Sequence, residues 1–146
     1  MTISPPRTWQ RGEYSISTET ARLDFPLIHA YLSHRSYWAR GRSLEIVRRS
    51  IENSVNFGVF HLKAQVGFAR VVTDFATFAW LADVFILEEH RREGLGKWLL
   101  ETIVALEELQ GLRRWLLATH DAHGLYRRYG FTSLRQPEHW MEKSTQ

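Results

Sequence analysis

The chain has 146 residues, a formal net charge of +3 and no cysteine. Its 44% hydrophobic and 24% charged residues are typical of globular proteins and exclude a wholly disordered or fibrous chain. Without cysteine there are no disulfides, thiolate metal sites or cysteine nucleophiles. The sequence has neither a signal-peptide core nor an apolar run of membrane-spanning length. We therefore expect a cytoplasmic protein without a membrane partner, with one domain over residues 1–146.

The positive charge comes almost entirely from arginine. Arginine supplies 16 of the 19 basic side chains, and the only lysines are Lys63, Lys97 and Lys143. Four Arg-Arg pairs are spread along the chain with acidic residues between them, and there is no basic tail. A nucleic-acid surface gathers its charge in one patch, so we expect no nucleic-acid partner.

The first part of the chain predicts one strand and two helices. Residues 1–12 contain two prolines and a glycine and are expected to form a loose lead-in. Residues 14–17 alternate as a short strand does. Asp24 and Ser43 each precede apolar residues at helical spacing, so we expect them to be the N-caps of two helices.

The rest of the chain predicts a sheet with further helices. The third of three consecutive strands is nearly all apolar, as in a central strand buried on both faces, and Asp83 is its one exception. Short turns between these strands indicate antiparallel pairing. The order β-α-α-β-β-β-α-β-α-β predicts an α/β protein with a mixed, mostly antiparallel sheet and helices on both faces. The predicted elements are strands over 57–62, 66–73 and 77–87, a helix over 95–109 followed by Gly111, a strand over 115–118, a short helix over 122–129 and a closing strand over 131–140.

The strongest chemical signal lies between the buried strand and the long helix. The residues there are Arg91-Arg92-Glu93-Gly94-Leu95-Gly96-Lys97. A helix start presents unpaired N–H groups to an anion, and glycines let phosphates approach the backbone. The spacing fits neither a P-loop nor a dinucleotide fingerprint. An ordinary glycine turn with a solvated arginine pair is the alternative.

Two motifs together resemble a known family. Arg91-x-x-Gly94-x-Gly96, after a strand and opening a helix, is similar to motif A of the GCN5-related N-acetyltransferase (GNAT) family, and Leu125-Tyr126-x-x-Tyr129-Gly130-Phe131 is similar to its LYxxxGF segment. The resemblance spans Tyr14 to Trp140 and implies the GNAT fold. It also implies transfer of an acetyl group from acetyl-CoA to a primary amine, which we expect to belong to a small metabolite. A protein or peptide amine and a non-catalytic acyl-CoA-binding module are the alternatives.

The resemblance also implies roles for particular residues. The pantetheine arm would pair with the backbone of Val84, Phe85 and Ile86. Arg91 matches the leading position of motif A, and Tyr126 matches a tyrosine that many relatives use as general acid. The pyrophosphate would rest on the backbone amides of Arg92, Glu93, Gly94, Leu95, Gly96 and Lys97.

The expected chemistry needs an oxyanion donor, an acid and a base. The Ile86 N–H group is a candidate oxyanion donor. Tyr126 could protonate the leaving sulfur, or it could be a packed aromatic residue. An amine of pKa near 10.4 is only about 0.04% neutral at pH 7. Asp83 is therefore our candidate base, with a carboxylate satisfied by arginine or by backbone N–H groups as the equal alternative.

The loop at 119–123 departs from the family pattern. Many relatives have an Asn there that binds the cofactor, whereas Thr119 or Asp121 falls near that place. We expect Asp121 to cap the helix that follows. His120 and His123 flank it, but the resemblance implies no metal.

The link at 34–42 is expected to form one wall of the acceptor pocket. Tyr37 and Trp38 could cover an amine or stack on a cation. Arg40 and Arg42 would favour an anionic group. A plain surface loop with an anchored tryptophan is the alternative. The resemblance also allows a homodimer.

Overall fold

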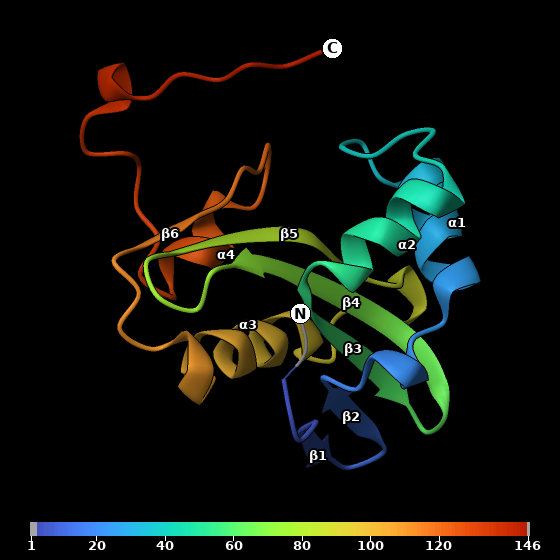
Figure 1. The fold of residues 1–146 in the computed structure, drawn as a ribbon. Coiled ribbons are helices and arrows are strands. Elements are labelled where there is room, and N and C mark those ends of the chain that lie inside the picture. Colours follow the sequence, from blue (N-terminus) through green and yellow to red (C-terminus); the bar gives the residue numbers. More distant parts are fainter. Residues whose placement is uncertain (1–2, 146) are drawn as a thin grey trace.

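The computed structural model describes residues 3–145 and has one six-stranded sheet in the order β1-β2-β3-β4-β5-β6 (Figure 1). Neighbouring strands are antiparallel except β5 and β6, which are parallel. This confirms the predicted mixed, mostly antiparallel α/β fold. The strands are β1 (Thr8–Arg11), β2 (Tyr14–Ser17), β3 (Val55–His61), β4 (Ala64–Thr73), β5 (Phe78–Ile86) and β6 (Arg114–Leu116). The helices are α1 (Phe25–Arg35), α2 (Leu44–Glu52), α3 (Leu95–Ala105) and α4 (His123–Arg127).

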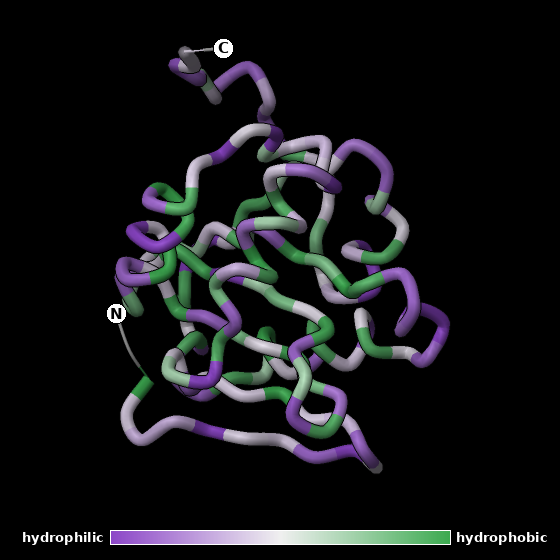
Figure 2. Tube along the Cα trace, turned by 90° about the vertical axis from the view of Figure 1, so that its right-hand side faces the viewer, coloured by the Kyte–Doolittle hydropathy of each residue, from purple (hydrophilic) through white to green (hydrophobic). Residues whose placement is uncertain are grey.

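Helices cover both faces of the sheet, as expected. α3 packs on one face, where Leu99 and Ile103 join Val59 and Val71 in the larger hydrophobic core. α1 and α2 pack on the other face in a second cluster that includes Phe85 of β5. Because β5 contributes side chains to both clusters, it is the central strand that its apolar sequence predicts. Hydrophobic stretches run through the middle of the molecule, and hydrophilic ones lie in the outer loops and toward the C-terminus (Figure 2).

The predicted helix starts are confirmed by their capping bonds. The Leu27 N–H group donates to Oδ1 of Asp24 at 3.0 Å, and the Ile46 N–H group donates to Oγ of Ser43 at 3.2 Å. The long helix is shorter than expected. α3 ends at Ala105, and Glu107–Leu109 form a separate 3-10 turn.

Both ends of the sheet differ from the prediction. The expected lead-in contains strand β1, which pairs with β2 through Trp9 and Ile16. The expected closing strand over 131–140 is wrong, because β6 is the last strand of the described chain. Pro137 starts a 3-10 turn there, and the Trp140 ring lies 4.6 Å from the Arg114 guanidinium of β6. The segment leads away from the body toward the C-terminus (Figure 1).

The two parallel strands separate soon after they pair. β5 and β6 are in register only from Phe78 to Trp80, opposite Arg114 to Leu116. Further along β5, the pairing with β4 shifts between Phe68 and Arg70, and Asp83 has a φ of +55°. Across this shift β5 has one residue more than β4, which makes a β-bulge, and a bulge twists its strand locally. The last residues of β5 therefore have a free edge on the β6 side.

Candidate active site

A cavity of about 350 Å³ lies where β5 and β6 diverge. Five of the predicted site residues line it: Tyr37, Trp38, Asp83, Val84 and Tyr126. Residues from the α1–α2 link, β4, β5, the segment after β6, and α4 thus meet at one place. The remaining lining residues are Arg42, Arg70, Trp80, Leu81, Ala82, Leu117, Ala118, Thr119, Asp121 and Ala122.

The carboxylate of Asp83 is held by three donors. Nε1 of Trp38 donates to Oδ1 at 2.9 Å. Nη1 of Arg42 and Nε of Arg70 both donate to Oδ2 at 2.9 Å. The Asp83 side chain is 2% exposed, so its charge is compensated inside the protein by these donors. The sequence left two roles open for Asp83, a catalytic base or a carboxylate satisfied by arginine, and these contacts are those of the second role.

Arg70 donates to Asp83 but is not among the site residues predicted from the sequence. It is a charged side chain in a strand whose neighbours Ala69 and Val71 are fully buried. The structure places it beside Asp83 of the adjacent strand, which is equally anomalous in its apolar surroundings. Two opposite charges in neighbouring apolar strands are a signal that could have identified the pair.

The α1–α2 link crosses the cavity and contacts the loop after β6. Within the link, the Ala39 N–H group donates to Oγ of buried Ser36 at 3.0 Å, which anchors the turn. The hydroxyl of Tyr37 accepts the His120 N–H group at 2.9 Å, and the two rings lie 4.4 Å apart. The link and this loop, both of which contribute lining residues, are thus joined beside the cavity.

The loop over 119–123 is arranged differently from our expectation. The Ala122 N–H group donates to Oγ1 of Thr119 at 3.2 Å, and Asp121 gives no capping bond to α4. The prediction that Asp121 caps this helix is therefore wrong. Asp121 lines the cavity instead, as does Thr119.

Tyr126 reaches the cavity from α4. Its ring packs edge-on against Phe131, with the ring centres 5.9 Å apart. Burial, then the nearby Tyr37 hydroxyl and Asp121 carboxylate, raise the pKa of Tyr126 to about 12. The hydroxyl is therefore protonated at neutral pH, in the form that can donate a proton.

The start of α3 carries a run of backbone donors. Helical bonding begins with the Trp98 N–H group, which donates to the Gly94 carbonyl at 3.1 Å. The six preceding N–H groups, from 92 to 97, have no acceptor among the described residues. Gly94 has a φ of +75°, and a Cβ added at Gly94 or Gly96 would have nothing within 4 Å. This turn is an open set of donors at the positive end of a helix dipole.

At the end of β5, the backbone groups of Ile86 face the space between β5 and β6. The Leu87 N–H group donates to Val66 of β4 at 2.8 Å. Successive strand residues point their backbone groups to opposite edges, so the N–H and C=O of Ile86 face away from β4. Nε of Arg91 donates to that carbonyl at 3.0 Å, and Nη2 donates to the Tyr31 hydroxyl at 3.0 Å. The side chain of Arg91 thus fastens the motif turn to the end of β5 and to α1.

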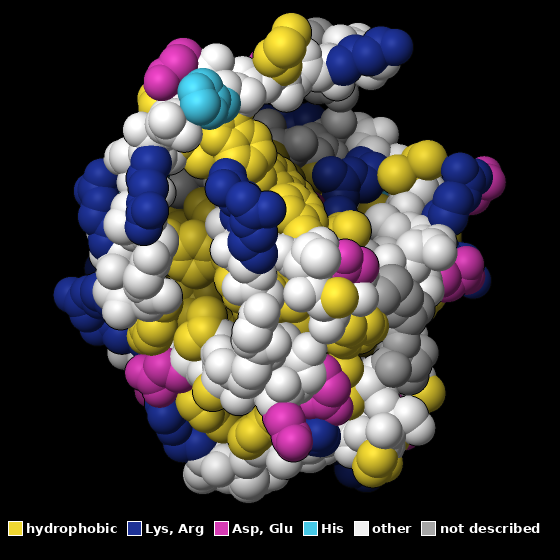
Figure 3. All heavy atoms as spheres, turned by 60° about the vertical axis from the view of Figure 1, so that its left-hand side comes forward, with side chains coloured by type: hydrophobic (Ala, Val, Ile, Leu, Met, Phe, Trp, Pro, Cys, Tyr) yellow, Lys and Arg dark blue, Asp and Glu magenta, His cyan; other side chains and the backbone are white. Residues whose placement is uncertain are grey.

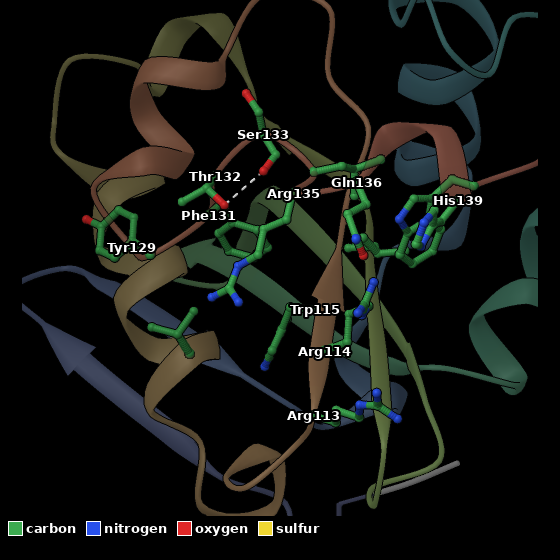
Figure 4. Close-up of a pocket in the computed structure, with 15 residues that line it drawn as sticks. Arg113, Arg114, Trp115, Tyr129, Phe131, Thr132, Ser133, Arg135, Gln136 and His139 are labelled. Carbon is green, nitrogen blue, oxygen red and sulfur yellow. Dashed lines mark hydrogen bonds between the residues drawn. The ribbon is translucent and has the colours of Figure 1, made fainter.

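A larger cavity of about 840 Å³ lies beside β6 and the C-terminal segment. Figure 4 shows its lining, which includes Arg113, Arg114, Arg135 and His139. On this side of the molecule a hydrophobic hollow is flanked by basic side chains (Figure 3). None of the predicted site residues lines it, and it borders the last turn of α3 through Val104. It is separate from the cavity between β5 and β6.

Comparison with known proteins identifies the family. The family model described as an acetyltransferase (GNAT) domain matches residues 53–133. This chain belongs to the GNAT acetyltransferase family. A candidate acetyltransferase of Gibberella zeae is 34% identical, over 85% of this chain and 81% of its own length.

Solved structures agree with this assignment. The crystal structure of a candidate GNAT acetyltransferase from Xanthomonas campestris pv. campestris is 48% identical and has a TM-score of 0.90, covering 93% of this chain and 96% of its own. A GNAT acetyltransferase from Elizabethkingia anophelis, solved with acetyl-CoA bound, has the same fold. It is 14% identical with a TM-score of 0.63, over 90% of this chain and 88% of its own. Within residues 3–145 of this GNAT protein, no helix is both long and apolar enough to cross a membrane.

Proposed function

We propose that this GNAT protein transfers the acetyl group of acetyl-CoA to the primary amine of a small molecule by direct attack of the amine. The observation that carries the proposal is the free edge at the end of β5, which leads from the cavity to the six unpaired N–H groups at the start of α3. An extended ligand arm can pair with a free strand edge as an added strand does. Phosphates bind to the N–H groups of a helix start.

The residues present fit acetyl-CoA. The N–H groups from 92 to 97 would hold its pyrophosphate, and the backbone of Val84, Phe85 and Ile86 would hold its pantetheine arm. Phe85 would contribute no hydrogen bond to that arm, because its backbone groups face β4, where it is in register with Phe68, and its side chain stacks on Tyr31 with ring centres 4.0 Å apart. Acetyl-CoA supplies a thioester, whose carbonyl carbon the amine attacks.

The protein groups around the gap would promote that reaction. The Ile86 N–H group would donate to the carbonyl oxygen as negative charge develops on it. As the carbon–sulfur bond breaks, Tyr126 would give its proton to the sulfur. The tyrosine recovers a proton from the newly acylated nitrogen through solvent. Asp83, with both oxygens engaged, would position Trp38, Arg42 and Arg70 on the acceptor side.

The size of the cavity favours a small acceptor over a peptide. About 350 Å³ is near the lower end for small-molecule sites. The contact of Tyr37 with His120 joins the α1–α2 link to the loop after β6, and a peptide chain bound in the cavity would have to avoid this contact. A peptide amine therefore fits less well than a free small amine.

Thermal melting and thiol release test the proposal together. A ligand at about 100 times its Kd adds roughly 2.7 kcal/mol to the unfolding free energy, which is several degrees of Tm. We expect acetyl-CoA and CoA, but not NAD, to raise Tm, and amines to release thiol. Stabilisation without release from any amine would favour the non-catalytic binding module. No stabilisation would refute the proposal.

A charge placed in the turn supplies the matching variant. Gly96→Glu brings a carboxylate and bulk to the donor run, so we expect the acetyl-CoA shift in Tm to disappear. The variant should fold, because a negative charge near a helix start stabilises the helix by about 0.3–1 kcal/mol. Gly96→Ala is the uncharged control. Unchanged CoA affinity in Gly96→Glu, measured by titration calorimetry, would show that the phosphates bind elsewhere.

A further inference from the structure

The acceptor side of the cavity has an unequal distribution of charge. Arg42 and Arg70 carry two positive charges beside the single negative charge of Asp83. Both arginines line the cavity, with side chains 22% and 14% exposed. This cluster (Arg42, Arg70 and Asp83, called the arginine cluster below) therefore has a net charge of +1 in a largely desolvated wall.

The arginine cluster is a poor place for the ammonium end of an amine. Both oxygens of Asp83 are already engaged, so the carboxylate has no oxygen left without a protein donor. The excess positive charge would repel a cation. The lining also includes Asp121, from the loop after β6, whose exposed carboxylate carries the opposite charge. The amine of the acceptor is thus directed to the side of Asp121 and Tyr126.

Arg42 has donors to spare for an anion. A guanidinium has five N–H donors, and Asp83 takes one of those on Arg42 at 2.9 Å. The planar fork suits a carboxylate, which it can bind through two parallel hydrogen bonds. A single excess positive charge balances one carboxylate. A phosphate dianion would bring a second negative charge that the wall does not compensate.

We propose that the acceptor is a small amino carboxylate, a molecule with a primary amine and a carboxylate, and that Arg42 binds the carboxylate. The inference rests on the proposed acetyl transfer and names its substrate class. The aromatic residues Trp38, Trp80 and Tyr37 also line the cavity and suit an apolar body between the amine and the carboxylate of the acceptor. Arg70, which also donates to Ser54 at 3.0 Å, holds the cluster in place.

Matched pairs of compounds test the class without any mutation. Each pair differs only in the carboxylate: phenylalanine and 2-phenylethylamine, leucine and 3-methylbutylamine, 4-aminobutyrate and propylamine. Thiol release with acetyl-CoA gives kcat/KM, and calorimetry on the CoA-bound protein gives Kd independently of turnover. In at least one pair, we expect the carboxylate to improve kcat/KM and Kd by about 10- to 100-fold, the usual effect of a hydrogen bond to a charged group.

Variants in the same link assign the effect to one side chain. Arg42→Gln should remove the advantage of the carboxylate, and Arg42→Lys should keep part of it. Arg40→Gln is the matched control, because Arg40 is exposed and does not line the cavity. Asp83 keeps Arg70 and Trp38 in Arg42→Gln, and a melting curve checks that this variant is folded.

The outcomes separate this inference from the proposed function. Acetylation of the carboxylate-free amines as efficient as that of their partners would overturn the substrate class and leave the acetyltransferase reaction intact. An advantage of the carboxylate that survives in Arg42→Gln would overturn the role of Arg42. If CoA binds but no compound is acetylated, the calorimetric Kd values decide, and binding of no amino carboxylate overturns the inference. Absence of acetyl-CoA binding would refute the proposed function itself, and the inference with it.

Discussion

Replacing Tyr126 by Phe removes one hydroxyl from the cavity and little else. The ring can keep its edge-on contact with Phe131. We expect kcat to fall by about 10- to 1000-fold, toward the lower end of the usual effect of general acid catalysis. We expect a value at the lower end because the leaving group is a thiol of pKa about 8.5, which departs as the thiolate without needing a strong acid. CoA binding should change little, since the donors of the α3 turn are untouched.

The pH dependence follows from the protonation of this tyrosine. With its pKa raised to about 12, about 0.1% of Tyr126 is ionised at pH 9, against about 9% for a tyrosine of pKa 10. Because Tyr126 loses its hydroxyl proton mainly above pH 10, it remains a proton donor from neutral pH to pH 10. The acceptor amine, of pKa near 10.4, gains its neutral form as the pH rises, so kcat/KM should rise about tenfold for each pH unit below that value. The profile of Tyr126→Phe should run parallel to the wild-type profile and lie below it.

A thiol-release assay between about pH 6.5 and 10 measures both profiles. Tyr129→Phe is the control from the same motif, because its hydroxyl donates to the Lys97 carbonyl and does not line the cavity. An unchanged rate in Tyr126→Phe would return this tyrosine to a packing role. A fall in wild-type activity toward pH 10 that is missing from the variant would contradict the retained proton.

Two further predictions concern stability. Asp83→Asn leaves two guanidinium groups without their carboxylate, so chemical denaturation should show an unfolding free energy lower by about 2–4 kcal/mol. This loss is smaller than the usual cost of breaking a buried ion pair, because the arginines are partly exposed. Unchanged stability with a lower kcat would instead make Asp83 the base. Gly67→Ala puts a Cβ 2.6 Å from Cδ1 of Ile86 and 2.9 Å from the Phe85 carbonyl. It should cost about 1–3 kcal/mol, whereas in Gly124→Ala the added Cβ meets nothing within 4 Å. Equal melting temperatures of these two variants would rule out close packing at the end of β5.

Local signals predicted the elements well. The caps at Asp24 and Ser43 and the apolar run of β5 depend on residues within a turn or a strand of one another, and each was found where expected. The exceptions are the C-terminal end of the long helix, which stops at Ala105, and the two ends of the sheet. Phe131 and Trp140 suggested a strand, but pairing depends on a partner edge, and Trp140 contacts a side chain of β6 instead.

The sequence by itself determined the mixed α/β fold, the glycine turn at 91–97 that opens a helix and the family resemblance, because each is encoded in short spacings along the chain. Only the tertiary structure decided which side chains line the cavity between β5 and β6. Arg42, Arg70 and Asp83 come from three separate elements and meet only when β4, β5 and the α1–α2 link pack together. Equally, Arg42 lines the cavity and Arg40 does not, although both lie in one link. Burial and charge compensation act between residues distant in sequence, so the acceptor side of the site cannot be derived from spacing alone.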